Sequence, residues 1–208
     1  MALYYAVAGS YYDAAKLLVE NGADVNERVP IKCPTPDEMG YGLRSKCDKH
    51  TVSLLHIATC NNDTSIVKLL ILNGANQGSC CDGSSCVHIA ICKGNADIVR
   101  LLYQYDVDVG KECIIPYRDC YKCSTSERKD SIGDIELALD CDYTDVIATI
   151  ASYQTQTIRN EMLIDAYNKD SHLNTIKKLI DMGADRSIIR KSIENKYNYY
   201  KSLYDLME

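Results

Sequence analysis

The sequence contains no phenylalanine and no tryptophan, and only four of its 208 residues are proline. Its formal net charge of −6 lacks the cationic excess of a surface that binds nucleic acid phosphates, so we expect no nucleic acid partner. No apolar run reaches the roughly 18 residues that a membrane span needs, and the first residues do not form a signal peptide. The sequence therefore predicts a soluble, cytoplasmic protein that is not bound to a membrane.

Motifs for chemistry are also missing. The eleven glycines are scattered over predicted caps and turns instead of forming a phosphate-binding loop. Serine, histidine and aspartate residues show no spacing that indicates a nucleophile and its base, and no paired-carboxylate site is evident. We therefore predict a protein that is not an enzyme and has no cofactor.

The eleven cysteines are the exception to this lack of reactive groups. Because a signal peptide is absent, we expect reduced thiols instead of disulfides. Ligand types suitable for zinc occur at Cys113, Cys120, Cys123, Cys33, Cys47 and His50. Only Cys120 and Cys123 have the C-x-x-C spacing, so we predict no metal site. A zinc-binding or redox-sensing module stays open as an alternative.

A repeated pattern of paired helices organises the chain. Leu55 to Asn76 contains LHIATC, VKLL and NGAN, which predicts a short helix, a second helix and a glycine at its end. The same order runs from Leu3 to Asn26, and again from Val87 to Asp106, where aspartate replaces the glycine. One pair of short helices cannot bury its own apolar stripes. The pairs must therefore stack into an array.

Two further units have weaker signals. One is set by Ile135, Ala138 and Val146 in the same register, and the other runs from Met162 to Asp185. Apolar residues then recur every three or four positions from Ile189, which predicts an amphipathic helix that caps the array. We predict an all-α fold with five units at about residues 1–26, 51–77, 83–109, 131–155 and 160–186, and a capping helix at 187–208.

The first unit begins almost at Met1, without a capping residue or a preceding turn. This favours a fragment of a longer protein, and a natural first unit with a frayed helix is the alternative. Tyr4 and Tyr11 occupy helix positions that we expect to be partly buried.

Two insertions, at residues 27–50 and 111–130, interrupt the array. The glycines that end the first and second units are roughly 50 residues apart, against a usual period of about 33. All four prolines lie inside the insertions, which predicts loops there. Each insertion has five basic and four acidic residues in an otherwise acidic chain, so an acidic protein partner should dock there more readily than elsewhere.

The segments LHIA…VKLLILNGAN and DGSSCVHIA…GNADIVRLL resemble ankyrin repeats, whose pattern is D-G-x-T-P-L-H-x-A-A-x-x-G-H followed by V-x-x-L-L-x-x-G-A-D-x-N. The resemblance is strong over residues 2–26 and 51–109. It implies that the insertions are hairpin fingers beside a concave face.

The resemblance also assigns a structural role to two histidines. His56 and His88 occupy the position of the histidine in the Leu-His pair of the family pattern. In ankyrin repeats the imidazole of this histidine hydrogen-bonds a hydroxyl two or three residues earlier and ties one repeat to the next. Ser53 and Ser85 supply that hydroxyl in this sequence.

Ankyrin repeats bind other proteins through their concave helices and fingers, so the resemblance implies a protein-binding module. The contact positions of the family correspond to Lys49, His50, Val52 and Cys60 in the second repeat, Cys81, Asp82, Ser84 and Cys92 in the third, and Lys129, Asp130, Ile132 and Asp140 in the fourth. Cationic and tyrosine side chains of the insertions are further candidates: Arg28, Lys32, Tyr41, Tyr117, Arg118, Tyr121 and Lys122.

The abundance of tyrosine, isoleucine, asparagine and lysine, the irregular repeats and the long insertions resemble the ankyrin proteins of poxviruses. This implies a host partner in innate-immune signalling, including the NF-κB pathway, or in cell death. Many such proteins recruit a ubiquitin ligase through a C-terminal F-box-like segment, which residues 186–208 do not match, so a ligase adaptor is expected only if the natural chain is longer. The alternative is a cellular scaffold or assembly protein.

Overall fold

The computed structural model describes residues 1–30, 51–75, 85–106, 133–169, 173–190 and 192–194. Most of these residues are helical. The helices are α1 (Ala2–Ala8), α2 (Tyr12–Glu20), α3 (Leu54–Cys60), α4 (Thr64–Leu72), α5 (Cys86–Cys92), α6 (Ala96–Gln104), α7 (Asp134–Cys141), α8 (Thr144–Ser152), α9 (Gln156–Asn168) and α10 (Leu173–Asp181).

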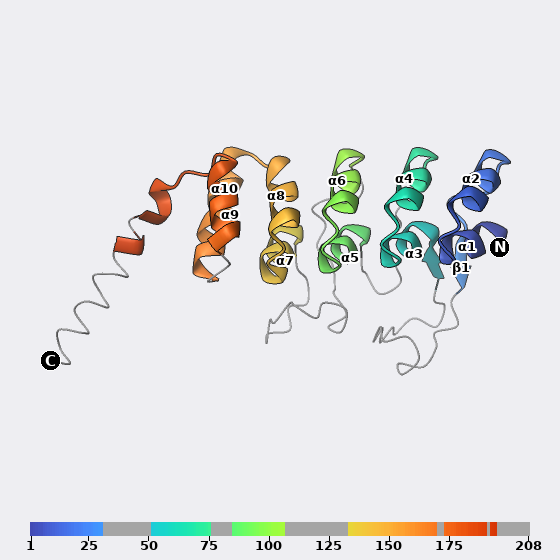
Figure 1. The fold of residues 1–208 in the computed structure, drawn as a ribbon, viewed down its shortest axis with the longest axis horizontal. Coiled ribbons are helices and arrows are strands. Elements are labelled where there is room, and N and C mark those ends of the chain that lie inside the picture. The colour runs from blue at the N-terminus through green and yellow to red at the C-terminus, as the bar shows by residue number, and fades with distance from the viewer. Residues whose placement is uncertain (31–50, 76–84, 107–132, 170–172, 191, 195–208) are drawn as a thin grey trace, which may run out of the picture.

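Successive helices pack as pairs, and the pairs stand side by side in a row (Figure 1). Each helix also packs on the corresponding helix of the next pair, so that α1, α3, α5, α7 and α9 form an inner layer and α2, α4, α6, α8 and α10 form an outer layer. The N-terminus lies at one end of the row, and α9 and α10 lie toward the other (Figure 1).

Side-chain caps and left-handed residues set the ends of the helices. Asp63 Oδ1 accepts a hydrogen bond from the Ile66 backbone N–H at the start of α4, and Asn95 Oδ1 does the same for Ile98 at the start of α6, both at 3.0 Å. Just after α4, Gly74 has a φ of +79°, and Asp106 takes the same left-handed conformation after α6 with a φ of +50°. The predicted equivalence of Asp106 with the terminal glycine is confirmed.

One continuous apolar core runs along the row, between the layers and between neighbouring pairs. It extends from Leu3 to Ile189. A buried alanine recurs in each inner-layer helix, which lets neighbouring inner helices approach closely. These alanines are Ala6, Ala58, Ala90, Ala138 and Ala166.

A short antiparallel sheet corrects the all-α prediction. β1 (Arg28–Pro30) pairs with β2 (Thr51–Ser53), with Val29 opposite Val52. Residues 28–30 were predicted to be loop because Pro30 lies there, but a proline is tolerated at the end of an edge strand, where no ladder hydrogen bond needs its nitrogen. The remainder of the first insertion and the whole second insertion lie outside the described residues.

The C-terminal helices also depart from the predicted bounds. α9 begins at Gln156, earlier than the predicted start of the fifth unit at residue 160. Residues 187–190 and 192–194 are helical, and Ile189 packs into the core. The rest of the predicted capping helix, 195–208, lies outside the described residues.

The two N-terminal tyrosines differ in their burial. Tyr4 is partly buried, as predicted. The prediction for Tyr11 is wrong, because this residue precedes α2 as its N-cap and its exposed ring lies over Gly9. Among the described residues, none of the helices combines the length and apolar character that a membrane crossing requires.

Candidate functional site

Two serine–histidine pairs open the inner-layer helices α3 and α5. Ser53 Oγ lies 2.7 Å from His56 Nδ1, and Ser85 Oγ lies 2.5 Å from His88 Nδ1. Each serine oxygen also accepts a hydrogen bond from the backbone N–H of its histidine, so it caps the helix. The predicted hydroxyl–imidazole contact is confirmed in both units.

The second pair extends into a buried polar cluster of Ser85, His88, Tyr103 and Asp134, here called the Asp134 cluster. His88 Nε2 lies 3.6 Å from Asp134 Oδ1, and the Tyr103 hydroxyl donates a hydrogen bond to Asp134 Oδ2 at 3.0 Å. All four residues are buried. The cluster therefore joins α5, α6 and α7 by polar contacts inside the apolar core.

Ser85, His88 and Asp134 are the residue types of a hydrolytic triad, but their arrangement serves the fold. Ser85 Oγ caps the helix and contacts His88 Nδ1. In a hydrolytic triad the serine contacts Nε2 of the histidine, and Nδ1 contacts the aspartate. The serine, the histidine and the aspartate are all sealed from solvent. The arrangement ties the pair α5/α6 to α7.

The environment of Tyr103 favours its neutral form. Burial raises the pKa of the Tyr103 phenol well above its usual value, and the charge of Asp134 and the hydrogen bond to it raise this pKa further. Above about pH 10 an unfolded tyrosine loses its proton, while folded Tyr103 keeps it. The stabilising contribution is therefore complete below about pH 10 and is lost progressively as the pH rises toward the folded pKa.

Accordingly, the free energy of unfolding should fall by an extra ~1.4 kcal/mol per pH unit above pH 10 because of Tyr103. Urea unfolding of the reduced protein between pH 8 and pH 11 measures this slope. Tyr103→Phe should reduce the slope by that amount, whereas Tyr105→Phe, which removes an exposed tyrosine just after the same helix, should retain it. Equal slopes for wild type and Tyr103→Phe would contradict the assignment.

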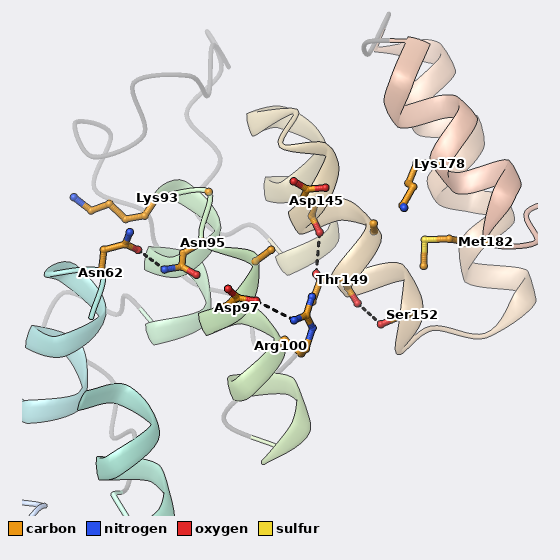
Figure 2. Close-up of a pocket in the computed structure, with 13 residues that line it drawn as sticks. Asn62, Lys93, Asn95, Asp97, Arg100, Asp145, Thr149, Ser152, Lys178 and Met182 are labelled. Atoms are coloured by element: carbon orange, nitrogen blue, oxygen red, sulfur yellow. Dashed lines mark hydrogen bonds and ion pairs between the residues drawn. The ribbon is translucent and has the colours of Figure 1, made fainter. Parts of the chain in front are cut away.

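An open groove of about 720 Å³ crosses the outer layer over α6, α8 and α10. Figure 2 shows Arg100 of α6 and Lys178 of α10 on either side of α8, with Arg100 Nη1 bonded to Asp97 Oδ1 at 2.9 Å. The groove exists because α8 has the small residues Ala148, Thr149 and Ser152 where α6 has Arg100, Leu101 and Gln104. Its mixed, polar lining suits a polar protein segment better than an apolar ligand.

Comparison with protein families decides what these paired helices are. A family model described as ankyrin repeat matches residues 1–29, and one described as ankyrin repeats (3 copies) matches residues 39–113. The two matches together cover half of the chain. The chain contains ankyrin repeats over these residues. No curated protein matches it. Ankyrin repeats are in general non-enzymatic modules that bind other proteins.

Five of the predicted contact residues of this ankyrin-repeat chain lie in its described part. Arg28 is exposed on β1, Val52 is partly buried on β2, and Cys60 and Cys92 are partly buried at the ends of α3 and α5. The structure thus brings Cys60 and Cys92 to the same position in successive inner-layer helices. The other candidates lie outside the described residues: Lys32, Tyr41, Lys49, His50, Cys81, Asp82, Ser84, Tyr117, Arg118, Tyr121, Lys122, Lys129, Asp130 and Ile132.

Asp140, the fifth described candidate, holds two ankyrin helices together. Its side chain on α7 is only 5% exposed and forms an ion pair with Lys169, which follows α9. A neighbouring polar contact reinforces the same junction, because the Thr175 hydroxyl donates to Asp142 Oδ1 at 3.0 Å. The observed role of Asp140 is to link the fourth helix pair to the fifth.

The described cysteines are in two chemical states. Cys60, Cys86 and Cys92 are thiols, whereas Cys141 is disulfide-bonded. The expectation of reduced thiols is therefore wrong for Cys141. That expectation rested on the absence of a signal peptide, which indicates the cellular compartment but does not show which sulfur atoms lie close together. The part of the chain that the structure describes holds no group of three potential metal ligands. The insertion cysteines and His50 lie outside that part.

Proposed function

We propose that the chain is a non-enzymatic binding module of five ankyrin repeats, α1/α2 to α9/α10, closed by a C-terminal capping helix. The observation that supports this best is that α7/α8 and α9/α10 continue the two layers formed by the helices within the family matches. Ala138 and Ala166 are buried like the alanines of the earlier inner helices. A rigid array of this kind acts by holding or occluding its partner.

The binding surface in this proposal is the inner-layer face together with the two fingers. Arg28 is an exposed cation at the base of the first finger, where β1 pairs with β2. Cys60 and Cys92 add small, partly exposed side chains on successive inner helices. The fingers are the least acidic parts of an acidic chain, which favours an acidic protein surface as the partner.

We further propose that the partner is a host innate-immune or cell-death signalling protein, bound in the cytoplasm by a viral host-range or immune-evasion factor. The support is the composition bias, the irregular repeats and the long insertions, which are similar to those of poxvirus ankyrin proteins. Sequestration of the partner is the proposed mode of action for these 208 residues. Recruitment of a ubiquitin ligase is not part of this proposal, because residues 186–208 do not match the F-box-like segment.

The test is affinity capture from mammalian cytosol, followed by binding measurements on the captured protein. Arg118→Glu combined with Lys122→Glu in the second finger should weaken binding at least about tenfold, because an acidic partner would then face like charges. Lys68→Glu combined with Lys177→Glu changes the net charge equally, at exposed positions of α4 and α10, and should leave the affinity unchanged.

Three outcomes would count against the proposal. If no protein is enriched over a bead control, the binding module itself is in doubt. If both double variants weaken binding equally, the fingers are not the docking surface. A captured protein with no role in immune or death signalling would leave the module intact and remove the host-range assignment.

A further inference from the structure

A row of cations follows the outer layer of the array. The fifth residue of an outer helix is basic and exposed in α2, α4, α6 and α10; these residues are Lys16, Lys68, Arg100 and Lys177. In α8 the fifth residue is Ala148. The row therefore has one gap, and this gap has helix pairs on both sides of it.

The gap in the cation row forms the floor of the outer groove. The floor is a single face of α8, because its residues recur at helical spacing; they are Asp145, Ala148, Thr149 and Ser152. Arg100 of α6 and Lys178 of α10 lie on either side of this floor (Figure 2). The groove therefore runs along α8 and has a cation on each rim.

The dimensions of the groove fit one α-helix. Packed helices lie about 8–10 Å apart, and small side chains at the contact allow the shorter distances. Because α6 and α10 both pack against α8, their axes are roughly 16–20 Å apart. A helix with its side chains is about 10–12 Å wide, whereas a strand occupies about 5 Å of a sheet. A helix lying on α8 therefore fills the groove better than an extended segment does.

The charges of the groove favour an acidic occupant. Its lining has three basic and two acidic residues, in a chain whose net charge is −6. Lys178 is exposed and has no hydrogen bond or ion pair within the part of the chain that the structure describes. Arg100 is paired with Asp97 of its own helix, but both side chains are exposed, so this ion pair contributes little and a new carboxylate can replace Asp97. Each rim thus offers a cation to an acidic side chain.

We propose that the outer groove is a second docking site, which binds an acidic α-helix of a partner protein. The bound helix lies on α8, with small side chains against Ala148 and Thr149 and with a carboxylate on each flank, one toward Arg100 and one toward Lys178. Asp145 lies in the first turn of α8, so it attracts the positive N-terminal end of a helix that runs parallel to α8.

This site is separate from the binding surface of the proposed function. The groove belongs to the outer layer, whereas the proposed surface consists of the inner-layer face and the fingers. One chain can therefore hold two proteins at the same time, one on each layer. The inference does not depend on the identity of the partner that binds the inner layer.

Selection from a displayed library of helical peptides of about 14 residues, roughly four turns, tests this proposal on the 208-residue protein. Counter-selection on Ala148→Arg removes peptides that bind elsewhere. The surviving peptides should have acidic residues on both flanks, and a central proline should abolish their binding.

Ala148→Arg should weaken these peptides at least about tenfold, because its side chain fills the groove. Helix α6 has an arginine at the same position, so α8 should accommodate it. The variant adds a positive charge, so an acidic peptide that is held by charge alone would bind it more tightly than the wild type.

A matched pair of charge reversals separates the groove from the rest of the outer layer. Lys178→Glu should weaken the selected peptides at least about fivefold, because it removes one rim cation. Lys68→Glu makes the same change at an exposed position of α4, away from the groove, and should leave the affinity unchanged. Fluorescence anisotropy with labelled synthetic peptides measures the affinities, and far-UV circular dichroism shows that each variant is folded.

Three outcomes would overturn the proposal. The first is that no peptide survives the counter-selection, and the second is that the survivors are not acidic. The third is that Lys68→Glu weakens the peptides as much as Lys178→Glu does. Failure of the proposed function is distinguishable, because Arg118→Glu combined with Lys122→Glu changes the second finger and should leave these peptides unaffected.

Discussion

Replacing Asp134 by alanine is expected to lower the free energy of unfolding by about 2–4 kcal/mol, because it leaves two buried polar side chains without their partner. The substitution removes the carboxylate that receives the Tyr103 hydroxyl and faces His88 in the core. Both groups are buried, so each loses a polar contact that water cannot easily replace. Urea unfolding followed by far-UV circular dichroism at pH 7 measures the loss.

The position of Asp134 predicts a second signature. The residue begins α7, at the junction between the first three helix pairs and the last two. In an array whose units contact only their neighbours, a weakened junction divides one cooperative transition into two. We expect the C-terminal helix pairs of the Asp134→Ala variant to unfold at a lower urea concentration than its N-terminal helix pairs.

Asp145→Ala is the matched control for the variant of Asp134. Asp145 lies in the first turn of α8, so Asp145→Ala, like Asp134→Ala, removes a favourable interaction with a helix N-terminus. Unlike Asp134, Asp145 is exposed. Its replacement should cost about 1 kcal/mol or less. Equal losses for the two variants would show that the helix dipole, and not the buried cluster, accounts for the effect of Asp134.

The architecture was predictable because its signals are local. A Leu-His or Val-His pair, an alanine two residues later and a terminal glycine lie within one unit, and each has its own physical cause in capping, close packing or a left-handed turn. The Ser53–His56 contact was predictable for the same reason, since its two residues share one helical turn. Repetition of the pattern then required stacking.

The Asp134 cluster was not predictable, because its members are joined only by the fold. His88 and Asp134 are separated in sequence by the second insertion, and no periodicity relates them. The one local signal was an acidic residue at the start of a predicted helix, which is common and has a separate explanation in the helix dipole. Burial of that residue is a tertiary property.

Other departures have equally specific causes. A three-residue strand that ends in Pro30 has too few residues for an alternating pattern. The outer groove results from three small residues on α8, and their effect appears only when α8 is compared with α6 in space. The sequence shows where each predicted contact residue lies within its repeat, but not whether that residue is buried. Asp140 was therefore predicted to contact a partner, although its side chain is only 5% exposed and forms an ion pair with Lys169.

The second large effect is expected from the core of the outer layer. Leu102→Ala should lower the free energy of unfolding by about 2–5 kcal/mol, because the leucine is fully buried and alanine leaves a cavity where its side chain was. Helix α6 packs against both α4 and α8, so neither neighbour is free to collapse into the space. Leu72→Ala, the same chemical change at an exposed position of α4, should cost less than about 0.5 kcal/mol.

Leu18→Ala completes this series, since Leu18 and Leu102 occupy the same place in α2 and α6. Leu18→Ala should cost clearly less than Leu102→Ala, because Leu18 is only partly buried and less of its side chain is shielded from water. Equal losses for Leu18→Ala and Leu102→Ala would contradict this dependence of the cost on burial.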